Sequence, residues 1–184
     1  MNYRKLILTV VALTLFTSVY AKPKIRLAPG ASCFVWNENT KFKPSGVPNG
    51  GFVDEGNHFC AKNIHACEEL KAVDAACFIM WEGYLQVLKT DEYRFSLVTD
   101  GHRYVKVFLN GKSLMVRNTD GKKTIVAQAT MKRGFVKIRI YYNPNRAFYN
   151  EGRVGFSLWF GSKMAMKMTN ITPSVLFHPV DSER

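Results

Sequence analysis

The alternation of apolar and polar residues in the second half of the chain constrains the fold most strongly. In Val136–Ile140, valine and isoleucine alternate with Lys137 and Arg139, which we expect to point outward. Three further segments repeat this period of two: Tyr93–Leu97, Val105–Leu109 and Val154–Phe160. Successive side chains of a strand point to opposite faces, so the pattern predicts strands that bury one face.

Turn signals separate these segments. Asn110-Gly111 stands between Val107–Leu109 and Leu114–Val116 and is the strongest hairpin signal, because a type I′ turn needs positive φ at both central positions. Thr119-Asp120-Gly121 and Arg133-Gly134 mark further turns. Strands joined by such turns predict an all-β chain that folds as an antiparallel β-sandwich or barrel.

The first 21 residues predict export. Two basic residues precede the apolar run Leu6–Phe16, and Val19 and Ala21 stand in the positions of a signal-peptidase site. The run is shorter than the roughly 20 residues that a membrane-spanning helix needs, and no later segment reaches that length. We expect a protein that is secreted, periplasmic or on the cell surface. An uncleaved N-terminal anchor is the alternative.

The cysteines are consistent with an oxidising compartment. All of them lie in one N-terminal segment: Cys33, Cys60, Cys67 and Cys77. An even number in an exported chain predicts two disulfides, and three connectivities are open. A zinc site is the alternative, because His58 and His65 lie close to cysteines, but no C-x-x-C pair is present.

The predicted organisation has three parts. Residues 1–21 form the signal peptide, residues 22–77 an irregular cysteine-containing segment, and residues 78–179 the β-sandwich. Turn-forming residues dominate parts of the middle segment, where Gly50-Gly51 is expected in a turn. One short helix is expected at Asn63–Val73.

The sequence predicts no catalysis. Acidic residues are scattered, and G-x-S-x-G and H-E-x-x-H motifs are absent. The formal net charge is +12, and it falls to +10 if Arg4 and Lys5 leave with the signal peptide. This excess favours an anionic partner. Because the basic residues are spread along strands and turns, we expect solvated strand faces and no nucleic-acid binding.

Six motifs in chain order resemble the protective-antigen-type domain, a β-sandwich of anthrax protective antigen, yeast flocculins and adhesins. They are Trp81–Leu85 with Tyr93–Leu97, Thr99–Gly101, Phe108–Lys112, Lys132–Phe135, Phe156–Trp159 and Thr172–Phe177. The resemblance covers about Phe78–Pro179. It implies a role in carbohydrate binding or adhesion, since many members bind glycans, some through calcium.

The resemblance also implies where a ligand binds. In the family, loops at one end of the sandwich form the site, and these correspond to Asp100–Tyr104 and Asn143–Gly152. The candidate ligand-binding residues are Asp100, His102, Arg103, Tyr104, Arg146, Tyr149 and Asn150. Aromatic rings can stack on a sugar while arginines favour acidic glycans. Solvated loop residues without a ligand are the alternative.

Calcium at this site depends on Asp100. Glycan-binding members with calcium typically carry two consecutive aspartates, whereas this chain has Thr99 before Asp100 and Gly101 after it. A hard cation takes six to eight oxygens, of which one carboxylate supplies few. Asp100 is therefore either a calcium ligand or a plain turn residue.

Two functions follow. The first is an exported, lectin-like module for glycan binding or cell adhesion, without catalysis. The second is an envelope protein-interaction protein, such as a periplasmic inhibitor, an immunity-type protein or a pilus-associated subunit. An exposed aromatic beside polar groups near Asp100 favours the first, and a flat or edge-strand surface favours the second.

Overall fold

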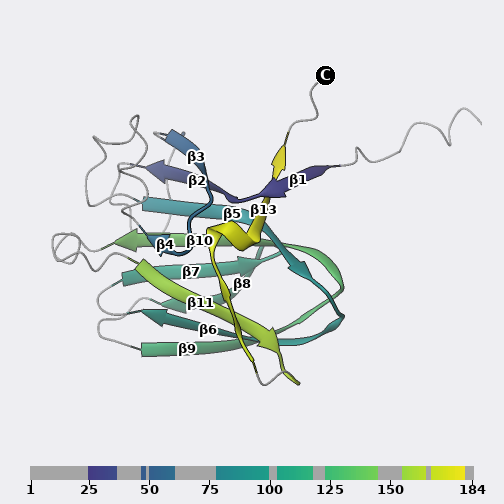
Figure 1. The fold of residues 1–184 in the computed structure, drawn as a ribbon. Coiled ribbons are helices and arrows are strands. Elements are labelled where there is room, and N and C mark those ends of the chain that lie inside the picture. The colour runs from purple at the N-terminus through teal and green to yellow at the C-terminus, as the bar shows by residue number, and fades with distance from the viewer. Residues whose placement is uncertain are drawn as a thin grey trace, which may run out of the picture. The chain divides into compact units, whose positions relative to one another are not determined.

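Two antiparallel β-sheets make up the described part of the computed structural model (Figure 1). It describes residues 25–36, 47–48, 50–60, 78–99, 103–117, 123–144, 155–164 and 167–180. The sandwich occupies the compact unit Leu27–Pro179. A second unit comprises Met1–Arg26 and Val180–Arg184, of which residues 25, 26 and 180 are described.

The larger sheet has the strand order β1-β13-β5-β10-β7-β8, and β2 pairs with both β5 and β3. Its strands are β1 Arg26–Pro29, β2 Ala31–Trp36, β3 Gly50–Asp54, β5 Phe78–Val87, β7 Arg103–Leu109, β8 Lys112–Arg117, β10 Gly134–Pro144 and β13 Leu176–Val180. A 3₁₀ turn at Pro173–Val175 leads into β13. This sheet forms one layer of the sandwich.

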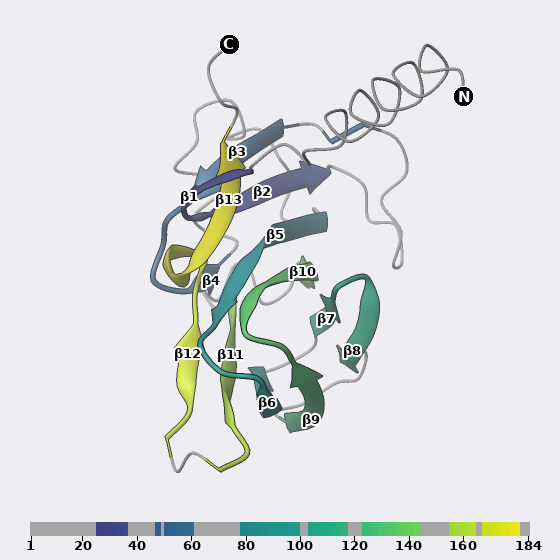
Figure 2. The same ribbon diagram turned by 90° about the vertical axis from the view of Figure 1, so that its right-hand side faces the viewer.

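The smaller sheet has the order β12-β11-β6-β9, with β4 paired to β11. Its strands are β4 Phe59–Cys60, β6 Asp91–Thr99, β9 Lys123–Met131, β11 Gly155–Ser162 and β12 Thr169–Ile171. In Figure 2, β6 and β9 lie below β7 and β8 of the larger sheet. The prediction of an antiparallel β-sandwich is confirmed.

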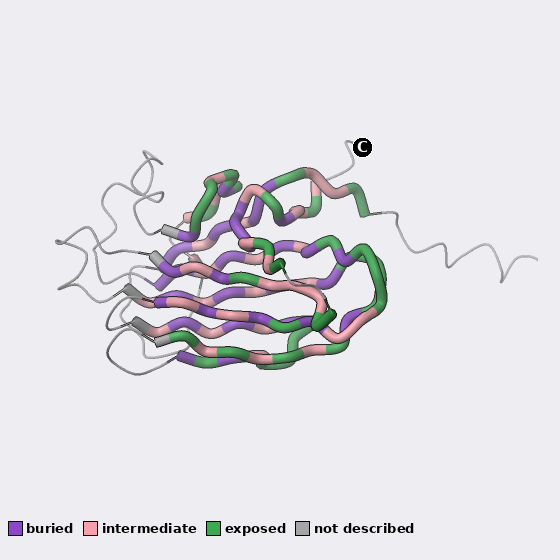
Figure 3. Tube along the Cα trace, turned by 60° about the horizontal axis from the view of Figure 1, so that its bottom comes forward, coloured by how far each residue is buried: buried purple, intermediate pink, exposed green. Residues whose placement is uncertain are grey.

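The alternation predicted for β10 is present. Val136, Ile138 and Ile140 are buried in the core, whereas Lys137 and Arg139 lie half-exposed on the opposite face. Figure 3 shows the same alternation of buried and more exposed residues along neighbouring strands. Because the side-chain period of a strand is two, a slip of one residue would bring both cations into the core.

The hairpin predicted at Asn110-Gly111 joins β7 to β8. Asn110 has φ 48° and Gly111 φ 79°, the positive values that a type I′ turn requires. The turn is also tied to β10. The backbone N–H of Asn110 donates to the carbonyl of Lys137 at 2.8 Å, and Asn110 Oδ1 accepts from the Lys137 backbone N–H at 3.1 Å.

A buried tryptophan marks the centre of the core. The Trp81 ring lies 5.2 Å from the Phe59 ring between centroids, and Phe59 stacks on Phe156 at 5.0 Å. Trp81 Nε1 donates to Asp54 Oδ2 at 2.8 Å, and the backbone N–H of Gly56 donates to Asp54 Oδ1 at 2.8 Å. Burying a carboxylate is expensive unless it is hydrogen-bonded, and these two donors supply that pairing.

The description of residues 22–77 as irregular is wrong for their described parts. Strands β1, β2, β3 and β4 lie there and join both sheets. Gly50 and Gly51 are not in a turn, because β2 pairs with them through Val35 and Phe34. A Cβ on Gly51 would lie 3.2 Å from the Phe34 ring and the Cys33 carbonyl, so glycine permits this close approach. Pairing with a neighbouring strand overrides the local turn preference.

Several sequence predictions fall outside the described residues. They are the signal peptide 1–21, the helix Asn63–Val73, and Cys67 and Cys77. Cys33 is buried on β2, and Cys60 ends β4 with its side chain not described. Disulfide pairing and the three-part division of the chain therefore stay predictions. No helix in the described part of the chain is long and apolar enough to cross a membrane.

Candidate functional site

The strands that flank the predicted ligand loops end at the same edge of the sandwich. In the larger sheet Pro144, the last residue of β10, pairs with Arg103, the first residue of β7. In the smaller sheet Thr99, the last residue of β6, pairs with Phe156 near the start of β11. We call this edge the loop end (left in Figure 1). Residues 100–102 and 145–154 both connect strands there.

Other connections meet at the loop end as well. Thr99 also pairs with Lys123, the first residue of β9, and Gly155 pairs with Cys60. Trp36, the last residue of β2, pairs with Phe78, the first residue of β5. The described strands that flank residues 37–46, 61–77 and 118–122 therefore also end or begin there. This topology allows side chains far apart in the sequence to approach one another there.

Most of the predicted site residues lie outside the described residues: Asp100, His102, Arg146, Tyr149 and Asn150. Arg103 begins β7, and its side chain is not described. Tyr104 is half-buried and pairs with Asn143 of β10. Burial, with a smaller contribution from Tyr141, raises the pKa of the Tyr104 hydroxyl.

The seven residues as one site remain a prediction, because Tyr104 is the one among them whose side chain the structure describes. Calcium at Asp100 also remains a prediction. Among the described residues, no group of three or more His, Cys, Asp or Glu side chains could hold a metal ion.

A second cluster lies on the outer face of the larger sheet, where β10 runs between β5 and β7. Cross-strand pairing places Arg139 beside Glu82 on one side and Phe108 on the other, and Tyr141 beside Lys106. We call this cluster the β10 face. It comprises Glu82, Lys106, Phe108, Lys137, Arg139 and Tyr141.

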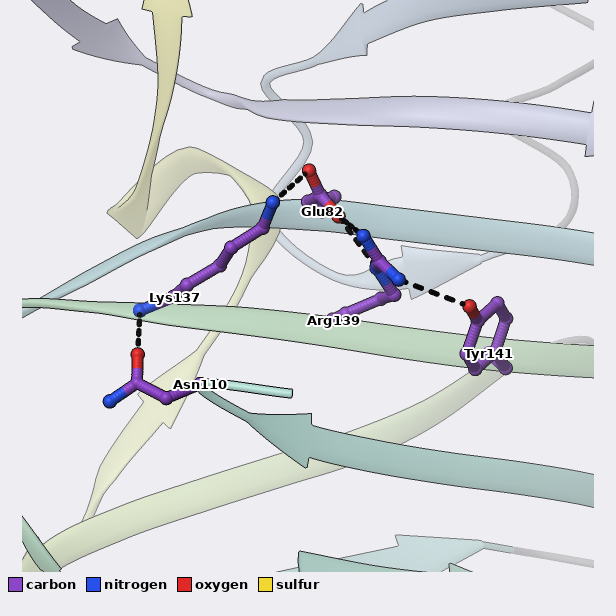
Figure 4. A network of polar contacts seen from close by, with 5 residues as sticks. All are labelled: Glu82, Asn110, Lys137, Arg139 and Tyr141. Carbon is purple, nitrogen blue, oxygen red and sulfur yellow. Dashed lines mark hydrogen bonds and ion pairs between the residues drawn. The ribbon is translucent and has the colours of Figure 1, made fainter. Parts of the chain in front are cut away.

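One carboxylate of the β10 face holds two cations (Figure 4). Lys137 Nζ lies 2.7 Å from Glu82 Oε1. Arg139 Nε donates to Glu82 Oε2 at 2.6 Å, and Arg139 Nη2 also pairs with that oxygen. Arg139 Nη1 donates to the Tyr141 hydroxyl oxygen at 3.5 Å. The trio of Glu82, Lys137 and Arg139 keeps one net positive charge.

Both partners of the Glu82–Arg139 pair are charged at neutral pH. Burial would raise the pKa of the Glu82 carboxyl, but hydrogen bonds and positive charge from Lys137 and Arg139 outweigh it, so the pKa lies below its usual 4.5. Burial would lower the pKa of Arg139, but Glu82, and to a smaller extent Tyr141, raise it above its usual value.

Aromatic rings border these charges. The Phe108 and Tyr141 rings are nearly perpendicular, at 86°, with centroids 5.5 Å apart. Lys106 Nζ lies 4.7 Å from the centre of the Phe108 ring, within the range of a cation–π interaction. A hollow of about 240 Å³ opens among the side chains. Its described lining is Phe108, Gly111, Lys137, Arg139 and Tyr141.

Sequence reasoning missed the β10 face as a site. It placed Lys137 and Arg139 outward but interpreted them as solvated charges. The available signal was an aromatic residue in the same outward register, since Tyr141 follows Lys137 and Arg139 at intervals of two. Phe108 follows Lys106 in the same way on β7. Contiguous exposed apolar surface that polar residues rim can mark a binding site.

A larger hollow, of about 550 Å³, lies away from the loop end. It opens between β8 and β9, the last strands of their sheets in the described topology. Its described lining includes the apolar Leu114, Met131 and Phe135 and the basic Lys112 and Arg133, with no acidic residue. Val116 on β8 and Val126 on β9 are exposed apolar residues of these two strands.

Comparisons with known proteins identify the fold. No family of known sequences matches the chain. No curated protein matches it either. Among solved structures, an anti-sigma factor domain-containing protein matches 86% of this chain and 51% of its own, with 17% identity and a TM-score of 0.61. A second such protein, from Clostridium clariflavum, has 49% of its length matched. This chain thus spans about half the length of these two proteins.

Two further matches cover nearly the whole of the other chain. The PA14 sugar-binding domain from an RTX adhesin has 12% identity and a TM-score of 0.51 over 78% of this chain and 95% of its own. The Epithelial Adhesin 9 A domain from Candida glabrata, in complex with Galβ1-3GlcNAc, has 10% identity and a TM-score of 0.56 over 86% and 93%. The chain is similar in fold to these domains. The resemblance stated from sequence motifs is supported at the level of the fold.

Proposed function

We propose that this protein is an exported glycan-binding or adhesion module with no catalysis of its own. The observation that carries the proposal is the meeting of the strands that flank residues 100–102 and 145–154 at one end of a PA14-like sandwich. Loops mounted on a rigid sheet commonly carry binding residues. One matching structure is named a sugar-binding domain, and another is a complex with Galβ1-3GlcNAc.

The proposed ligand is a glycan at the loop end, with an acidic glycan favoured. Arg103 and Arg146 supply positive charge, and Tyr104 and Tyr149 supply rings on which a sugar can stack. The formal net charge of +12, or +10 without Arg4 and Lys5 of the predicted signal peptide, favours the approach of an acidic surface from solution. Calcium held by Asp100 is one version of this site, in which binding requires the metal.

A glycan array probed with the mature protein, with and without a chelator, tests the proposal. We expect binding, and a chelator-sensitive signal supports calcium. The variant Tyr149→Ala/Arg146→Ala should weaken binding at least about tenfold. The control, Phe135→Ala/Lys132→Ala, removes an aromatic ring and a cation from exposed positions around the junction of β9 and β10, away from the loop end. It should bind like the parent. Unchanged binding by a folded loop variant would remove this site.

The edge between β8 and β9 favours a second candidate, an envelope protein-interaction protein. Val116 of β8 and Val126 of β9 are exposed apolar residues. Both strands are the last of their sheets among the described residues, and an edge strand can bind a partner's backbone. This candidate predicts an empty glycan array. It also predicts that a photocrosslinker at Val126 captures one protein in the envelope, whereas a crosslinker at Val175, also exposed, captures none.

A further inference from the structure

We propose that the β10 face is a separate binding site for a sugar ring that carries a carboxylate. The site lies on the outer surface of β5, β7 and β10 and uses none of the residues assigned to the loop end. It therefore goes beyond the proposed function, and it can be present whether or not the loop end binds a glycan.

Charge favours an anion. The face carries three cations, Lys106, Lys137 and Arg139, against the single carboxylate of Glu82. The contacts of Arg139 with Glu82 and Tyr141 use three of the five N–H donors of a guanidinium, and Lys137 pairs with Glu82 through one of three. Donors therefore remain on both side chains for a ligand carboxylate.

The rings favour a sugar over a bare anion. Phe108 and Tyr141 form two nearly perpendicular apolar walls, on which the C–H face of a pyranose can pack. The hollow of about 240 Å³ is smaller than the cavities that enclose drug-sized ligands, so it fits one ring. Gly111 leaves the rim open, because even an added Cβ would meet no atom within 4 Å.

The site is formed before a ligand arrives. Glu82 fixes the positions of Lys137 and Arg139, and the two hydrogen bonds with Asn110 fix the backbone of Lys137. Side chains that are already ordered lose little entropy on binding. A carboxylate that approaches from solvent would thus share cations already ordered by Glu82.

Three probes test the proposal by NMR titration of the full mature protein: glucuronate, glucose and inorganic sulfate. We expect glucuronate to shift the amide signals of Lys106, Phe108, Lys137, Arg139 and Tyr141 in a saturable way. Glucose should cause shifts at least about tenfold smaller at the same concentration. Sulfate alone should bind at least about tenfold more weakly than glucuronate, because it cannot use the rings. Equal responses to all three probes, or none, would overturn the site.

Matched variants separate a built site from general charge. Lys106→Gln/Lys137→Gln should weaken glucuronate binding about tenfold or more. Lys132→Gln/Lys167→Gln removes the same charge from exposed positions outside the face and should leave the affinity within about twofold. Phe108→Ala, which keeps every charge, should weaken glucuronate but not sulfate. If both double variants lose affinity equally, binding is non-specific and the proposal fails.

The same titration distinguishes this site from the loop end. Shifts confined to Arg103, Tyr104 and Asn143 would place glucuronate at the loop end, which overturns the β10 face and leaves the proposed function intact. Shifts on the β10 face in a protein whose glycan array is empty would support this inference and count against the proposed function.

Discussion

The two faces of β10 share one backbone, but one packs in the apolar core and the other forms ion pairs at the surface. On the inner face, Val136, Ile138 and Ile140 are at most 5% exposed. Such side chains can pack against any apolar surface of matching shape. On the outer face the side chains of Lys137 and Arg139 are 39% and 40% exposed and both pair with Glu82. The inner face thus specifies the fold, whereas the outer face carries charged side chains that pair with one another.

The largest expected effect is on the inner face. Ile138→Asp places a carboxylate in the core without a partner, and we expect a loss of at least about 4 kcal/mol in the free energy of unfolding, which abolishes the fold. Ile138→Val, the control, should lose about 0.5–1.5 kcal/mol. Urea unfolding followed by circular dichroism measures both. A cooperative transition near the parental midpoint for Ile138→Asp would show that the core is assigned wrongly.

A buried polar residue refines the comparison, because it tests how much one buried hydrogen bond contributes to the free energy of unfolding. Asp54→Ala leaves the buried Trp81 N–H without its acceptor and should lower the free energy of unfolding by about 1–3 kcal/mol. Glu55→Ala, one residue on and exposed, should change it by less than about 0.5 kcal/mol. Equal losses in the two variants would mean that the hydrogen bond contributes nothing.

Lys137→Ala should have a small effect on stability, because half-exposed ion pairs contribute only about 0.2–1 kcal/mol. Lys137→Met, which keeps the apolar part of the side chain, separates lost packing from lost charge. Thermal unfolding of both variants measures the difference. A loss as large as that of Ile138→Asp would remove the distinction between the two faces.

The smallest effect is the dependence of stability on pH through Glu82. Its pKa is below 4.5 in the folded protein, so its ion pairs stabilise the fold above that pH, and the stabilisation is lost as pH falls through the lowered folded value. The free energy of unfolding of the parent should exceed that of Glu82→Gln by at most about 1 kcal/mol at pH 7. Urea titrations between pH 7 and 3 should show this gap closing. A gap that widens in acid contradicts the pKa direction.

The conformation of a residue could be predicted from the sequence where its near neighbours in the chain determine it. The inward positions of β10 follow from alternation alone, and the Asn110-Gly111 hairpin follows from the φ values that its turn requires. The N-terminal strands were missed for a physical reason. A two-residue strand such as β4 has no periodicity to detect, and Gly50-Gly51 becomes a strand only because β2 lies beside it.

The candidate sites show the same limit. The sequence places Lys137 and Arg139 on an outward face, but their partner Glu82 is 57 residues from Arg139 in the chain, and only strand pairing brings them together. At the loop end, the sequence resemblance led to residues 100–104 and 143–152. The strand registers show that both segments connect at one edge, which no local pattern could establish.

The pairing of β4 with β11 has a consequence for how fast the molecule forms. Phe59 pairs with Phe156, which lies more than half the chain length further on. Likewise, β2 pairs with β5, which follows it in the chain. Joining such distant segments requires the closure of large loops before any contact stabilises them, and β-rich domains of this kind typically fold in about milliseconds to seconds. A chain growing from its N-terminus therefore holds β4 without its partner until β11 has been made. The pairing of β4 with β11, like the still more distant bond of Gly30 to Leu176 in the larger sheet, is expected to be a late step of folding. A weakened Phe59–Phe156 contact should slow refolding or speed unfolding according to how early that contact forms.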